Sequence, residues 1–61
     1  MERDLVYYRR RLAAETAAAG VSAEPNVRRV HQELARQYEV RVAALEAEIR
    51  RAEMHIVVSA A

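Results

Sequence analysis

The feature that most constrains the fold is the position of the only glycine and the only proline, which both fall within residues 20–26. On either side of this segment the chain is dominated by Ala, Arg, Glu and Leu, which are strong helix formers. A single break between two such segments predicts an αα-hairpin. We therefore predict an all-α fold, an antiparallel two-helix hairpin with a longer second helix: helix one over about 3–19, a turn over 20–22 and helix two over about 23–56.

Three residues of the break have predicted roles in the turn. Gly20 is predicted to follow the last residue of helix one in the left-handed conformation, which a residue without a Cβ adopts readily. Ser22 is predicted to be the N-cap of helix two. Pro25 is predicted to lie in the first turn of helix two, where its missing N–H is not needed.

Apolar and aromatic residues recur every three or four positions in both segments, which gives each helix one apolar face. Folding the segments together around Val21 brings Tyr8 near Leu34 and Leu5 near Tyr38. For His31 we predict a hydrogen-bonded, partly buried place beside the tyrosines, because buried imidazoles and phenols usually find partners. The predicted intra-hairpin seam consists of Leu5, Tyr8, Leu12, Val27, Val30, His31, Leu34 and Tyr38.

In this register the first residue reaches only about as far as Val42, so roughly 20 Å of helix two lacks a covering helix. A chain of 61 residues without Cys has no disulfide to compensate for its small core, and oligomerisation is the remaining means of stabilisation. We expect a homodimer, in the form of a two-fold symmetric four-helix bundle. The predicted oligomer interface consists of Val42, Leu45, Ile49, Ala52 and Ile56.

These observations predict a small non-enzymatic, self-associating helical interaction protein. The alternative is a regulatory adaptor that binds a helix of another protein. A third hypothesis is weak nucleic-acid binding through Arg9, Arg10, Arg28 and Arg29, although a net charge of +1 gives little electrostatic attraction. No catalytic, cofactor-binding or metal-binding residues are predicted, and a cytoplasmic protein is expected because no apolar stretch approaches the length of a membrane span.

The combination of Glu2-Arg3-Asp4, Tyr7-Tyr8-Arg9-Arg10-Arg11 and the pattern H-x-x-L-A-x-x-Y at 31–38 resembles a group of short, uncharacterised bacterial proteins. These proteins are Ala/Arg/Glu-rich helical hairpins, and the resemblance covers about the first forty residues. It implies a hairpin in a bacterial cytoplasm and no particular activity. The end of the chain, 58–61, resembles the degradation tag that bacteria add to stalled translation products, so the tail is either an interface element or a degradation signal.

Overall fold

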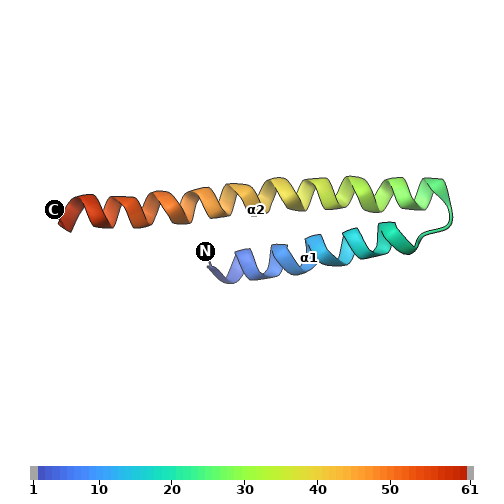
Figure 1. Cartoon of the computed structure of the whole chain (residues 1–61), viewed down its shortest axis with the longest axis horizontal. Coiled ribbons are helices and arrows are strands. Elements are labelled where there is room, and N and C mark those ends of the chain that lie inside the picture. The colour runs from blue at the N-terminus through green and yellow to red at the C-terminus, as the bar shows by residue number, and fades with distance from the viewer. Residues whose placement is uncertain (1, 61) are drawn as a thin grey trace.

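A computed structural model of the chain consists of two antiparallel helices of unequal length joined by a short connection (Figure 1). Helix α1 spans Glu2–Val21 and has 20 residues, and helix α2 spans Pro25–Ala60 and has 36 residues. The structure describes the backbone of residues 2–60 and the side chains of residues 2–55. It confirms the all-α hairpin with a longer second helix. Within the described residues, neither helix is long and apolar enough to cross a membrane.

The first helix ends later than the sequence predicts, because it continues through Gly20 to Val21. No described residue has a positive φ angle, so the predicted left-handed conformation of Gly20 is wrong. A Cβ atom added at Gly20 would have no other atom within 4 Å. The glycine therefore occupies an ordinary helical position with open space beside it.

Ser22 closes α1 and does not begin α2, so its prediction as an N-cap is also wrong. Its backbone N–H and its Oγ both donate to the carbonyl of Ala18, at 3.1 and 2.7 Å. The carbonyl of Ser22 in turn accepts two bonds from the guanidinium of Arg28, at 3.2 Å from Nε and 3.0 Å from Nη2. Helix α2 begins at Pro25, about two residues after the predicted start, and Pro25 lies in its first turn as predicted. The first helical bond runs from the Arg28 N–H to the Glu24 carbonyl at 2.9 Å.

The two helices meet about one turn away from the predicted register. The ring centres of Tyr8 and Tyr38 lie 6.0 Å apart, whereas the sequence pattern paired Tyr8 with Leu34. The cause is the position of the connection. Because α1 runs to Val21 and α2 starts at Pro25, the chain folds around Ala23, and each residue of α1 faces a position further along α2.

The C-terminal part of α2 extends past the beginning of α1 without a helix beside it (Figure 1). The molecule measures 55 × 15 × 12 Å, and its longest dimension agrees with about 54 Å expected for α2 alone. Glu46 is the last described residue of α2 that hydrogen-bonds α1. We call residues 47–60 of α2 the overhang. At 1.5 Å per residue it is roughly 20 Å long. The second helix therefore extends beyond the first by about the predicted length, although the register is shifted.

Candidate functional site

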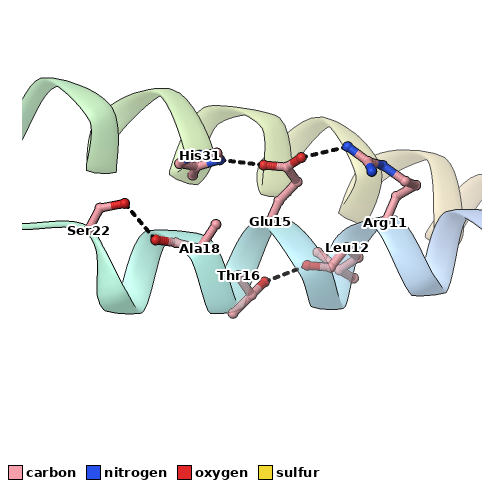
Figure 2. A network of polar contacts seen from close by, with 7 residues as sticks. All are labelled: Arg11, Leu12, Glu15, Thr16, Ala18, Ser22 and His31. Atoms are coloured by element: carbon pink, nitrogen blue, oxygen red, sulfur yellow. Dashed lines mark hydrogen bonds and ion pairs between the residues drawn. The ribbon is translucent and has the colours of Figure 1, made fainter.

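The most buried polar group among the described residues is the carboxylate of Glu15 on α1, which is only 5% exposed (Figure 2). Its Oε1 accepts a hydrogen bond from Nη2 of Arg11 at 2.7 Å, one turn earlier on the same helix. Its Oε2 accepts a bond from Nδ1 of His31 on α2 at 2.6 Å. We call Arg11, Glu15 and His31 the polar cluster. It is a charged contact that spans the two helices.

Both oxygens of the Glu15 carboxylate are therefore satisfied, which is the condition under which a protein tolerates a buried charge. The pKa of the Arg11 guanidinium is raised above its ordinary value mainly by the neighbouring Tyr38 side chain and, to a smaller extent, by Glu15. Arg11 is therefore a cation at neutral pH. Its Nε atom is buried without a hydrogen-bond partner. The cluster therefore consists of the Arg11 cation and the His31 imidazole, which both contact the buried carboxylate of Glu15.

Three tyrosines and two arginines extend this contact toward the start of α1. The ring centres of Tyr7 and Tyr8 lie 5.2 Å apart with a 73° angle between the planes, which is an edge-to-face arrangement. The guanidinium carbon of Arg11 lies 5.6 Å from the ring centre of Tyr38, and that of Arg41 lies 5.4 Å from the ring centre of Tyr8. Such cation–π contacts are worth about 0.5–1 kcal/mol each at exposed sites. They reinforce the same register as the polar cluster.

The structure brings together part of the predicted seam. Leu5 is buried, and the other members on α1 together with Leu34, Tyr38 and His31 on α2 are partly buried. His31 bonds to Glu15 and not to the tyrosines, so its predicted partner is wrong. Val27 and Val30 remain 41% and 57% exposed, because the shifted register leaves the Ala-rich end of α1 opposite this part of α2. Sequence reasoning missed Glu15, although it follows Leu12 by three positions on the buried face of α1.

The predicted interface residues divide between the hairpin and the overhang. Val42 is only 8% exposed, so it belongs to the interior of the hairpin and is not free to contact a partner. Leu45 and Ile49 are partly exposed and Ala52 is exposed. Ile56 lies outside the residues whose side chains are described. A shallow open depression of about 230 Å³ lies beside the beginning of α1, and its lining is Leu5, Arg9, Glu46, Ile49, Arg50 and Glu53.

A larger open groove of about 550 Å³ lies nearer the connection between the two helices. Three of its polar side chains make local contacts. Arg28 bonds the carbonyl of Ser22, Arg36 lies 3.5 Å from Glu33, and the hydroxyl of Thr16 donates to the carbonyl of Leu12 at 2.8 Å. No group of three or more metal-ligating side chains occurs among the described residues. What the arrangement supplies is a defined helix–helix register and an apolar stripe beyond it.

Comparison with family models, with curated proteins and with solved structures found no match to this chain. The resemblance to bacterial helical hairpins therefore stays a prediction.

Proposed function

We propose that this chain is a small non-enzymatic interaction protein that self-associates through its overhang, as a dimer of two hairpins with four helices in all. The observation that carries the proposal is the difference in length between the two helices. Helix α2 has 36 residues and α1 has 20, so α2 is longer by 16 residues. The apolar stripe of α2 continues through Leu45, Ile49 and Ala52. A stripe of that kind is typical of a helix that packs against another helix.

The exposed area supports a need for association. The chain exposes 4988 Å², whereas a compact monomer of this length is expected to expose about 4,000 Å². The excess of about 1,000 Å² is similar to the roughly 800 Å² that one partner contributes to an interface of ordinary size. The interior is thin as well, since none of the described side chains is fully buried. A partner would therefore add a large fraction of the total burial.

A second copy is the partner that fits the overhang in length. Two identical overhangs placed antiparallel about a two-fold axis cover each other from end to end, and each ends where the partner's α1 begins. Charge does not oppose this pairing. Residues 47–55 contain two glutamates and two arginines, so their formal charges cancel when His55 is neutral. The pairing also extends the packing pattern that α1 and α2 already use within one chain.

Sedimentation equilibrium over a range of micromolar concentrations tests the proposal. We expect a dimer whose melting temperature rises with protein concentration, because association stabilises the folded state by mass action. Ala52→Glu places a charge on the stripe at a residue that is exposed within the single hairpin, and it should shift the equilibrium to monomer. Met54→Glu is the matched control, since Met54 is 67% exposed on the opposite side of the same turn.

A wild-type chain that is well folded and stays monomeric over the whole concentration range contradicts the proposal. So does equal dissociation by Ala52→Glu and Met54→Glu, because the effect would then be independent of the helix face.

A further inference from the structure

Gly20 is the first of three features that the observed turn does not account for. Glycine within a helix is less stable than alanine by about 0.5–1 kcal/mol, because it loses more backbone freedom on folding. A positive φ angle or a close neighbour would justify the glycine, but its φ angle is not positive and a Cβ atom there would have no contact within 4 Å. In the observed turn an alanine would serve better at this position.

Ser22 and Val21 form the second feature. Serine is among the most favoured N-cap residues, and Pro25 follows it by three positions, within what would be the first turn of a helix capped by Ser22. In the structure Ser22 instead bonds backward to Ala18, and Val21 is an exposed helical residue. Together with Gly20 as a left-handed terminator, these residues would form a turn over 20–22. The local sequence thus suits a turn that ends α1 earlier.

The third feature is the exposure of Val27 and Val30, at 41% and 57%. A turn over 20–22 would move α1 back along α2 by about one helical turn, because the fold would centre on Val21 and not on Ala23. Residues three or four apart lie on the same helix face, so such a slide keeps the same faces in contact. It would also bring Leu12 opposite Val30, the more exposed of the two valines.

The geometry points to a second register of this hairpin, one helical turn from the observed one, with the polar cluster holding the hairpin in the observed register. Sliding α1 by one turn, about 5.4 Å, carries Glu15 away from His31 and breaks their 2.6 Å contact. A buried carboxylate that loses a partner is strongly disfavoured, so the cluster opposes the slide. One-turn displacements between packed helices are a known form of conformational change.

The slide changes the surface that the chain presents. In the second register α1 covers one turn less of α2, so Val42 and its neighbours would join the overhang. The inference does not depend on self-association, because the register is a property of a single chain. It is therefore tested by a distance within one chain.

The chain contains no Cys, so nitroxide labels can be placed at two chosen positions. Ala17→Cys on α1 with Ala44→Cys on α2 uses two exposed sites. In the observed register Ala17 faces a part of α2 that precedes Ala44 by several turns, and the slide increases this axial separation by one turn. Electron paramagnetic resonance should then report a distance longer by roughly 5 Å. An excess of unlabelled chain removes distances between copies.

Two unrelated changes should produce the longer distance. His31→Ala removes the α2 side of the polar cluster, and Val21→Pro ends α1 early without touching a buried residue. Adding Gly20→Ala to His31→Ala should restore the shorter distance, because alanine disfavours the left-handed terminator. A label pair within α2, Gln32→Cys with Ala44→Cys, should keep one distance in every variant.

The shorter distance in both His31→Ala and Val21→Pro overturns the second register. Loss of helical circular dichroism in both variants without a longer distance overturns it too, since the second register would not be a stable state. A longer distance in Val21→Pro alone overturns the holding role of the polar cluster.

Discussion

Helix α2 has two regions that carry the same apolar periodicity but face different surroundings. From His31 to Glu46 it meets α1 through the hydrogen bond between His31 and Glu15, a tyrosine pair and two cation–π contacts, and at Glu46 through a bond from Arg9. Beyond Glu46, α2 borders the first turns of α1 at the shallow depression, where Ile49 lies in the same lining as Leu5 and Arg9. Periodicity alone therefore does not reveal which part of a helix is covered. The length of the opposing helix does.

The two regions also differ in what could make a contact specific. In the covered region, burial of apolar side chains is slight, and the contacts that define the register are polar or aromatic. A one-turn slide would keep most of the apolar contacts but would break the contact between Glu15 and His31. In the overhang the stripe is apolar and would pack against a partner with little preference for register. Substitutions in the two regions should consequently fail in different ways.

The largest effect is expected for Leu45→Glu combined with Ile49→Glu, which replaces two apolar residues of the stripe. Full burial of one such side chain is worth about 1.5–3 kcal/mol, so the double change removes several kcal/mol from a fold of low stability. We expect dissociation and unfolding to occur together, as measured by sedimentation and by thermal circular dichroism. Val40→Glu with Met54→Glu, on exposed positions, should leave both properties nearly unchanged. A double variant that remains associated would contradict this expectation.

The next largest effect is expected within the covered region, for Glu15→Ala. The change removes the common acceptor of Arg11 and His31 and should lower the free energy of unfolding by about 1–3 kcal/mol. Urea denaturation at a fixed protein concentration measures it. Glu33→Ala is the control, because Glu33 forms an exposed ion pair with Arg36 at 3.5 Å. Exposed pairs of this kind contribute less than about 1 kcal/mol. Equal effects of the two changes would show that burial of Glu15 is unimportant.

The overall hairpin was predictable because one short segment holds both residues that interrupt helices. The unequal helices and the place of Pro25 in the first turn of α2 follow from the same segment. The register was not predictable in the same way. Gly20 and Ser22 have strong preferences as helix terminator and N-cap, yet α1 continues past the glycine and shifts the fold centre to Ala23.

The polar cluster escaped prediction for a different physical reason. A glutamate in a helix rich in Arg and Ala is normally solvated, and a local pair with Arg11 four positions away is consistent with an exposed face. The signal that could have revealed Glu15 was its spacing from the apolar residues of α1. Leu5, Leu12, Glu15 and Ala19 lie on one face of α1, and three of these four, Leu5, Glu15 and Ala19, are buried. Because the observed register differs from the predicted one, Val42 lies inside the hairpin and not at the predicted interface.

A smaller effect, of opposite sign, is expected for Gly20→Ala. Because the glycine has helical backbone angles and open space around it, alanine should stabilise the hairpin by about 0.5–1 kcal/mol. Ala13→Gly, at an exposed position of the same helix, should destabilise it by a similar amount. Thermal or urea denaturation of both variants provides the comparison. Destabilisation by Gly20→Ala would mean that the glycine adopts a left-handed conformation in solution, and it would favour the second register.

The smallest effect is expected at the boundary between the two regions, where Arg9 donates to Glu46 at 3.1 Å. The two side chains are 55% and 39% exposed, so solvent and salt screen the pair. A double-mutant cycle with Arg9→Ala and Glu46→Ala should give a coupling energy below about 1 kcal/mol that falls further at high salt. A larger coupling that resists salt would require the pair to be shielded from water. None of the residues that the structure describes provides such shielding, whereas a second overhang packed beside the beginning of α1 would.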